Sequence, residues 1–240
     1  MDFKNSPFVP PAVIIASALI IVACIASWSV LAARSYDSVL SVTGSAKKRV
    51  TADSVKWSLM VVRKVGESDI ADGYSLVYKD SETVRAFLTK NGIPDADILV
   101  QPPSADEIYR NDYGPRDFNV RQSVVVNSME VDAVESLSKR VQELSAKGIF
   151  VQNNWLEYYV STLPALRVEL LGAAVTDAKA RAVEIAKAGG TNVGALKSAA
   201  SGVVQVLAPN SIDVSDYGQY DTQSKEKDVM ITARATFFVR

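Results

Sequence analysis

A run of 25 residues without a charged side chain, from Val9 to Ala33, lies near the start of the 240-residue chain. The centre of the run is almost wholly aliphatic, and about 20 such residues suffice to cross a bilayer as a helix. Asp2 and Lys4 precede it, and Arg34 closes it. We therefore predict an N-terminal tail over residues 1–8 and a transmembrane signal anchor over residues 9–34, with the lipid bilayer as its partner.

A cleaved signal peptide is the alternative interpretation of this run. The apolar stretch exceeds the roughly 7–15 residues of a signal peptide's apolar region, and Lys4 is the only basic side chain before it. We therefore favour an uncleaved anchor. The charges leave its orientation open, because basic residues at 34 and 47–49 favour a cytoplasmic domain whereas long domains cross largely regardless of charge.

The composition excludes several classes of chemistry. The chain has no histidine, and its one cysteine, Cys24, lies inside the apolar run. This excludes His-dependent triads, His or Cys metal sites and internal disulfides. With 26 basic and 27 acidic residues the chain lacks the basic excess of a nucleic-acid-binding protein. No phosphate-binding, dinucleotide-binding or nucleophile-elbow motif is present. We expect no catalytic residues, no cofactor, no metal and no nucleic-acid partner, and thus no enzyme.

Residues 35–240 show the patterning of one α+β domain. Alternating apolar residues predict strands, and apolar stripes at helical spacing, ended by Gly, predict helices. The predicted elements are strands at 39–51 and 55–61, a helix at 68–91, a hairpin of 98–109 and 118–126, a helix at 130–147, a strand at 149–160, a helix at 164–190, and strands at 193–208 and 229–239. Within this order β-α-β-β-α-β predicts a split βαβ arrangement, an antiparallel or mixed sheet with helices on one face.

Two of the helices have apolar stripes that can be read in detail. In the helix at 130–147 the apolar residues are Val131, Val134, Leu137, Val141 and Leu144. In the helix beginning near Pro164 they are Leu171, Ala174, Val175, Ala178, Ala182, Ile185 and Ala186. We expect both stripes to face the sheet.

A short repeat links two of the predicted hairpins. Asp112-Tyr113-Gly114 lies between the first pair of strands and Asp216-Tyr217-Gly218 between the last pair, each following a helix that ends in glycine. The repeat is consistent with an internal duplication. Chance is the alternative, because Asp, Tyr and Gly are frequent in turns.

Four tyrosines form the candidate contact surface. Tyr109 and Tyr113 lie at the first hairpin tip, and Tyr217 and Tyr220 lie at the second. If the hairpins are side by side, these residues form an aromatic and polar surface for a protein or a glycan. The alternative is local packing within each loop.

Carboxylates also gather at the two tips. They are Asp106, Glu107, Asp112 and Asp117 at the first, and Asp213, Asp216 and Asp221 at the second. Oxygen ligands of this kind suit Ca²⁺, but the spacing does not match an EF-hand loop. We favour solvated loops over a calcium or carbohydrate site.

Three stretches resemble the SIMPL-domain family of bacterial extracytoplasmic proteins. They are the strand Leu40–Ala46, the helix segment Ala174–Ala182 with its Asp-Ala-x-x-(Lys/Arg)-Ala pattern, and the strand Ile231–Phe237. The resemblance covers about residues 38–240. It implies an extracytoplasmic location, homo-oligomeric and in some members ring-like assembly, and an association with the cell envelope and stress. It supplies no catalytic residues.

The hypothesis from sequence is a protein anchored in the inner (plasma) membrane by a single span. Its large domain lies on the periplasmic side, self-assembles into a homo-oligomer and acts in binding or scaffolding at the cell envelope. The alternatives are an envelope enzyme that uses carboxylate or Ser–Lys chemistry, and an oligomeric pore or cage.

Overall fold

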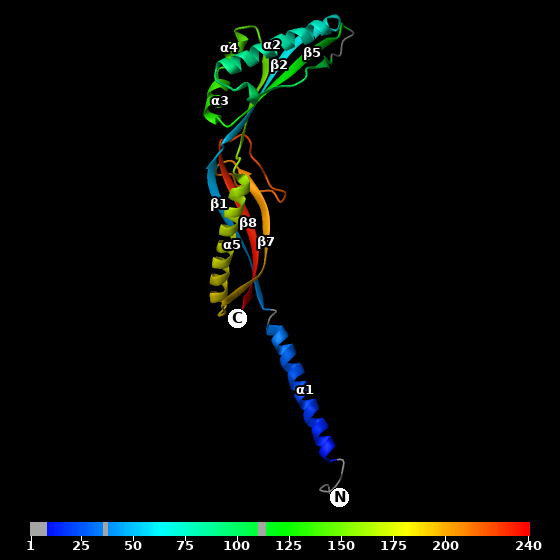
Figure 1. Ribbon diagram of the computed structural model, residues 1–240, viewed down its shortest axis with the longest axis vertical. Helices are drawn as coiled ribbons and strands as arrows, with labels where there is room; N and C mark the ends of the chain where they lie inside the picture. Colours follow the sequence, from blue (N-terminus) through cyan, green and yellow to red (C-terminus); the bar gives the residue numbers. More distant parts are fainter. Residues whose placement is uncertain (1–8, 36–37, 110–113) are drawn as a thin grey trace. The chain divides into compact units, whose positions relative to one another are not determined.

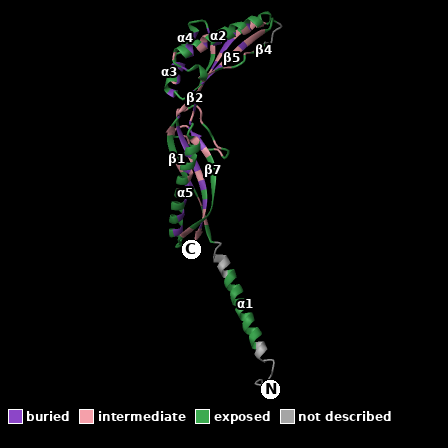
Figure 2. Ribbon diagram, viewed as in Figure 1, coloured by how far each residue is buried: buried purple, intermediate pink, exposed green. Residues whose placement is uncertain are grey.

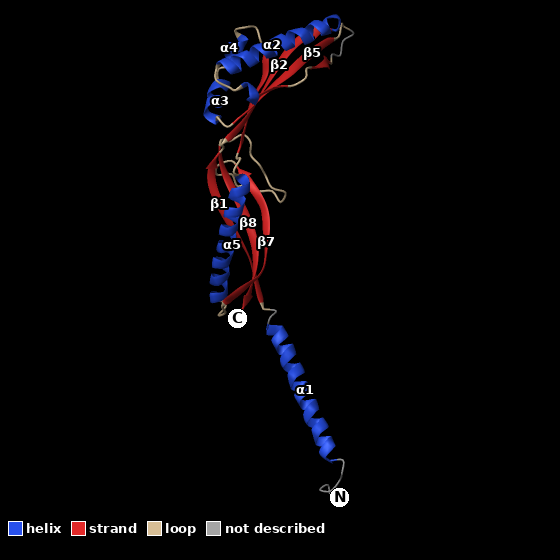
Figure 3. Cartoon of the chain, in the orientation of Figure 1, coloured by secondary structure: helices blue, strands red, loops and turns tan. Residues whose placement is uncertain are grey.

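The computed structural model describes residues 9–35, 38–109 and 114–240 of the chain. The predicted tail 1–8 and the residues Asp112 and Tyr113 lie outside this described part. Figures 1 and 3 show the order of helices and strands along the chain. The elements are α1 (Val9–Ser35), β1 (Val39–Thr51), β2 (Ser54–Gly66), α2 (Ile70–Lys90), β3 (Ile98–Val100), β4 (Ser104–Ile108), β5 (Asp117–Ser128), α3 (Val131–Ser138), α4 (Gln142–Ser145), β6 (Val151–Tyr159), α5 (Leu163–Ala188), β7 (Val193–Leu207) and β8 (Glu226–Val239).

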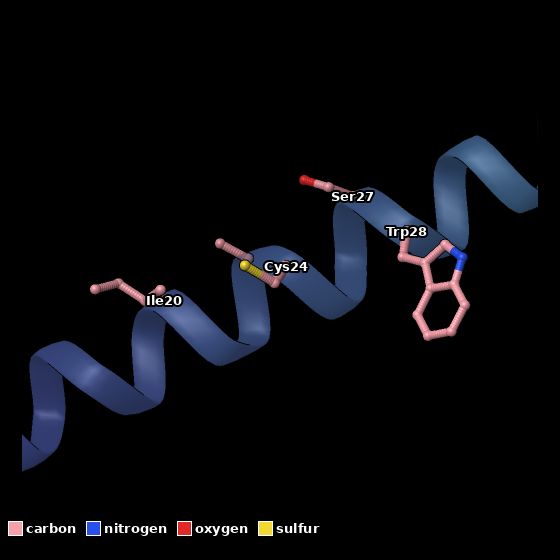
Figure 4. A pocket seen from close by; sticks show the side chains of 5 residues that line it. Ile20, Cys24, Ser27 and Trp28 are labelled. Atoms are coloured by element: carbon pink, nitrogen blue, oxygen red, sulfur yellow. The ribbon is translucent and has the colours of Figure 1, made fainter.

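Helix α1 confirms the predicted apolar helix. Its segment Val13–Val30 is long and apolar enough to cross a membrane, which fits a single-pass anchor or a signal sequence. None of that segment is buried against the rest of the chain. Ile20, Cys24, Ser27 and Trp28 project from neighbouring turns of α1, where with Ala23 they line a shallow groove (Figure 4).

The chain divides into two compact units. Unit 1 comprises Met1–Ala46, Leu170–Gly202 and Ile231–Arg240, and unit 2 comprises Lys47–Glu169 and Val203–Met230. Because β1, α5, β7 and β8 each contribute residues to both units, the division does not follow the ends of the elements.

Unit 2 contains an antiparallel sheet with strand order β3-β5-β2-β6, and β4 extends it by pairing with β5. Strand β2 lies between β5 and β6, which is the split βαβ arrangement that the sequence predicts. Alternate residues of β2, from Val55 to Val61, are buried, and Trp57 is completely so. They form one core with Val84 and Leu88 of α2 and with residues of α3 and α4. The helices therefore cover one face of the sheet.

The helix predicted at 130–147 is two helices, α3 and α4, separated by a turn. The apolar residues of this segment are mostly three positions apart, which is shorter than the 3.6-residue turn of an α-helix. In one continuous helix the later residues would therefore rotate away from the sheet. The turn between α3 and α4 restores their direction, and all five predicted apolar residues are buried: Val131, Val134, Leu137, Val141 and Leu144.

A three-stranded sheet has the order β1-β8-β7, and the long helix α5 packs on it. The buried residues of α5 recur every fourth position and are Leu166, Leu170, Ala174, Ala178, Ala182 and Ala186. The predicted stripe was too wide, because Ile185 is 51% exposed and Leu171 and Val175 are only partly buried. Small alanines let the helix approach the strands closely, so a narrow stripe suffices.

The two sheets share a pattern of connection. In the larger sheet β2, α2, β4 and β5 follow one another, and β5 pairs with β2. In the smaller sheet α5, β7 and β8 follow one another, and β8 pairs with β1. In each sheet the last of these strands, β5 or β8, lies between two other strands. The two sheets differ in that β2 leads directly into α2, whereas the whole of the larger sheet lies between β1 and α5. The internal duplication stays a prediction.

Candidate functional site

Tyr220 is held within unit 2 by local contacts. Its hydroxyl accepts a hydrogen bond from the main-chain N–H of Val160 at 2.9 Å, and its ring centroid lies 5.8 Å from that of Tyr159. Lys227 Nζ lies 5.6 Å from the same ring. This tyrosine therefore fixes the loop between β7 and β8 against the end of β6.

The two tyrosine-bearing tips lie at opposite ends of β2. Tyr220 is next to Tyr159, which pairs with Ser54 at the start of β2. Tyr109 follows Ile108, whose strand partner pairs with Gly66 at the end of β2. Thirteen strand residues separate the two ends, a span of roughly 40 Å at about 3.3 Å per residue. The structure thus does not bring the two hairpins side by side.

Among the described tyrosines of this set, Tyr109 and Tyr217 are almost wholly open to solvent, and Tyr220 is 37% exposed. Tyr109 is 87% exposed and Tyr217 is 96% exposed. Tyr113 lies outside the described residues. A role for Tyr109 or Tyr217 in binding stays a prediction, now for two separate loops rather than one combined surface.

Three acidic residues of the first tip, all within the described part of the chain, are engaged by cations. Asp106 pairs with Arg121 at 2.5 Å, and Asp117 Oδ2 lies 2.9 Å from Lys64 Nζ. Glu107 lies 3.7 Å from Arg116. Within the described part of the chain, no three acidic or cysteine side chains come together in a group that could hold a metal ion.

The most strongly organised charged site lies at the base of the β7–β8 loop in unit 2. The Asp228 carboxylate, whose side chain is 1% exposed, lies 2.8 Å from Lys47 Nζ and accepts two hydrogen bonds from Arg49 at 2.8 and 3.0 Å. It also accepts the main-chain N–H of Asn210 at 3.2 Å. The hydrogen bonds from Arg49, then those from Lys47, hold the pKa of Asp228 well below its ordinary value.

Lys227 is the second organised group of this site, and it is completely buried. Its ammonium donates to the main-chain carbonyls of Asp221 and Ser224, the latter at 2.7 Å, and lies 3.7 Å from the Asp221 carboxylate. Burial lowers the pKa of Lys227, and the Asp221 carboxylate opposes that shift. The buried ammonium of Lys227 thus ties the main chain of the β7–β8 loop to the start of β8.

This arrangement differs from a Ser–Lys dyad, in which the amine must be within reach of a serine hydroxyl. The hydrogen bonds of Lys227 go to main-chain oxygens, and Ser224 contributes its carbonyl rather than its hydroxyl. Geometry therefore assigns Lys227 and Asp228 to fixing the loop. Sequence reasoning missed both residues; the signal was the run Glu226-Lys227-Asp228 at the start of an otherwise apolar strand.

Unit 1 brings together the three stretches that carry the family resemblance. A Cβ added to Gly44 of β1 would lie 2.2 Å from the carbonyl oxygen of Ala174 and 2.3 Å from the nitrogen of Ala178. The next residue, Ser45, donates its main-chain N–H to Asp177 at 2.8 Å. Arg181 Nε also donates to Asp177, at 2.9 Å. The Asp-Ala-x-x-Arg-Ala pattern is therefore a docking motif between helix and strand.

The third stretch completes the same contact. Ala178 and Ala182 of α5 form a core with Ala235 and Phe237 of β8, and Leu40 and Val42 of β1 pack against it. A model of the SIMPL family, described as a protein of unknown function (DUF541), matches residues 40–237. The chain belongs to the SIMPL family. The matched SIMPL region thus includes all three stretches and everything between them. Comparison with curated proteins gives no match.

Proposed function

We propose that this SIMPL protein is a single-pass membrane protein that acts by binding or scaffolding at the cell envelope. One observation carries the proposal: the 18 residues Val13–Val30 are apolar and wholly unburied, and the SIMPL region begins within ten residues of their end. An apolar surface of that extent requires lipid or protein around it. Anchoring of this segment in the inner membrane would surround its apolar surface with lipid.

The proposed location of the SIMPL domain is the extracytoplasmic side, as the family resemblance implies. A part in envelope stress is proposed on the same ground. Because the one cysteine, Cys24, lies in α1, the domain is independent of thiol redox conditions.

We propose a non-catalytic role because the organised charges have fixed partners. Asp228 is neutralised by Lys47 and Arg49, and Lys227 is held by main-chain oxygens. Asp80 forms two hydrogen bonds with Arg63, at 2.5 and 2.9 Å. Charged groups with fixed partners of this kind are typical of structural ion-pair networks, which perturb pKa values without taking part in a reaction.

Self-assembly is the third part of the proposal. A homo-oligomer of anchored chains would place many copies of each exposed loop on one surface, so that weak contacts act together. A closed oligomer is the expected form, because soluble homo-oligomers usually have closed symmetry. We propose more than two subunits because the family resemblance implies assembly that is ring-like in some members.

Protease protection in intact spheroplasts tests the proposed location. Protease added from outside should digest the SIMPL domain of the full chain without lysis. Digestion only after lysis would place the domain in the cytoplasm and contradict the proposal. A soluble cytoplasmic protein measured in the same sample is the control for intact membranes.

A further inference from the structure

Strand β1 has one main-chain edge that faces away from its own sheet. Val239 donates its N–H to the carbonyl of Ser38, and β1 pairs with β8 alone among the described strands. Because the ladder bonds of an antiparallel pair alternate, every second residue of β1 directs its main-chain groups outward. Ser45 is one of them, since its N–H reaches Asp177 rather than β8. The outward residues before it are Val39, Ser41 and Thr43.

A groove runs beside this outward edge within unit 1. It is lined by Val42 and Thr43 of β1 and by Ala180, Arg181, Glu184 and Ile185 of α5. The helix thus overhangs the open edge, and Asp177 holds Arg181 in place at 2.9 Å. Ile185, which belongs to the predicted apolar stripe of this helix, is half exposed on this flank. A strand added to β1 would lie in the groove.

Strand β7 presents the opposite edge of the same sheet. Its residues Ala195–Gly202 are exposed on both faces of the sheet (Figure 2). Most have small side chains, Leu196 is the one large apolar residue and Lys197 is the one charge. An edge strand of this kind pairs with another chain unless charges or covering segments protect it.

The directions of the strands decide how two such edges can meet. Asn192 and Arg240 exchange both main-chain hydrogen bonds, so β7 is antiparallel to β8. The contacts of Ser38 with Val239 and of Ser41 with Thr236 make β1 antiparallel to β8 as well. Strands β1 and β7 therefore run in the same direction, one at each edge of the sheet.

We propose that the β7 edge of one copy pairs with the β1 edge of a second copy and lies in the groove beneath its α5. The inference rests on the self-assembly proposed above and names its contact. Both halves of the contact lie on one chain, and the small side chains of β7 suit a shallow groove. Lys197 of the incoming strand, whose Nζ lies 5.4 Å from the centre of the Phe238 ring in its own chain, has a charge opposite to that of Glu184 in the groove. With α5 of both copies on the same face of the joined sheet, the pairing is parallel. It joins unlike surfaces, so it repeats from copy to copy and closes into a ring when the rotation permits.

Chemical cross-linking of the full chain in detergent tests the contact. In a Cys24→Ser background, Thr43→Cys and Ala199→Cys place one thiol at each edge of the sheet. Treatment with a short bismaleimide should give a ladder of dimers, trimers and larger species. Each single-cysteine variant should stop at the monomer, because like edges do not meet. The pair Thr43→Cys with Lys179→Cys, an exposed site of α5 outside the groove, is the matched control and should give no ladder.

Light scattering on the same samples separates this inference from the proposed self-assembly. A multimeric mass without a ladder would show that the chain assembles through another surface and would overturn the edge contact. Dimers of either single-cysteine variant, at the yield of the double variant, would show a contact between like edges and would also overturn it. A single chain per micelle would overturn both proposals.

Discussion

Asp177 Oδ2 accepts a hydrogen bond from the main-chain N–H of Ser45 at 2.8 Å, joining two residues 132 positions apart. The N–H of an edge strand would otherwise face solvent, and here a side chain of α5 captures it. This hydrogen bond, followed by the one from Arg181, lowers the pKa of Asp177 below its ordinary value. The most family-like motif of the sequence thus fixes the register between helix and strand.

Replacing Asp177 with alanine should lower the urea midpoint of the chain, because both Ser45 and Arg181 lose their acceptor. Asp177→Asn keeps one oxygen that can accept from Ser45, and should lose less stability. Urea denaturation followed by far-ultraviolet circular dichroism, which reports on the long helix α5, measures both variants. Equal midpoints for Asp177→Ala and the unmodified chain would show that the contact contributes nothing to stability.

Gly44→Ala should destabilise the protein by about 1–3 kcal/mol, because the added Cβ meets the main chain of α5 rather than a side chain that can move. Gly172→Ala is the matched control. Gly172 lies in α5 with nothing within 4 Å of an added Cβ, so alanine there should stabilise by about 0.5–1 kcal/mol. Chemical denaturation of the two variants should give opposite signs. An unchanged or raised stability for Gly44→Ala would contradict the close approach of β1 to α5.

Asp228→Asn should cost about 1–3 kcal/mol at neutral pH, because Lys47 and Arg49 lose a charged acceptor. The pKa of Asp228 is depressed in the folded chain, so its contribution is present above the unfolded pKa of about 3.8 and is lost as pH falls through the lower folded value. Stability measured from pH 7 downward should therefore converge for the two proteins in acid. Asp213→Asn, an exposed residue of the same loop, should show little difference at any pH. A constant gap for Asp228→Asn would contradict the ion pairs.

Ile20→Arg should weaken membrane insertion by about 2.5–3.5 kcal/mol, because it places a charge at the middle of the uncharged run. Carbonate extraction of membranes, followed by an intact-mass measurement, separates an anchor from a signal peptide. The unmodified chain should remain in the membrane with Met1 or Asp2 as its first residue. A mature N-terminus near Ala33 would contradict the anchor.

Local patterns in the sequence were sufficient to predict most of the fold. The alternation of Val55, Trp57, Leu59 and Val61 identified β2, and glycine-terminated stripes identified α2 and α5. The break between α3 and α4 was not predicted, because apolar residues spaced three positions apart and four positions apart are hard to distinguish over a short segment. Only the need to keep Val141 and Leu144 facing the sheet reveals it.

The candidate site was less predictable, because its geometry depends on contacts between distant segments. The four tyrosines were grouped by their place at hairpin tips, but the register of β2 puts the tips at opposite ends of a long strand. The charged run Glu226-Lys227-Asp228 marks Lys227 and Asp228 in the sequence, but their burial could not be predicted from it, because burial of a charge depends on partners such as Arg49, 179 positions away. Asp177 and Gly44, in contrast, lie in stretches of sequence that carry the family resemblance.

The mass of the full chain in detergent, measured by light scattering with the detergent contribution subtracted, tests the proposed assembly most directly. We predict a single species of more than two chains, at micromolar concentration and moderate salt. The mass should fall when Thr43→Pro removes an outward N–H from β1 without touching its bonds to β8. A single 25.9 kDa chain per micelle, at the same concentration, would contradict self-assembly and with it the scaffolding role.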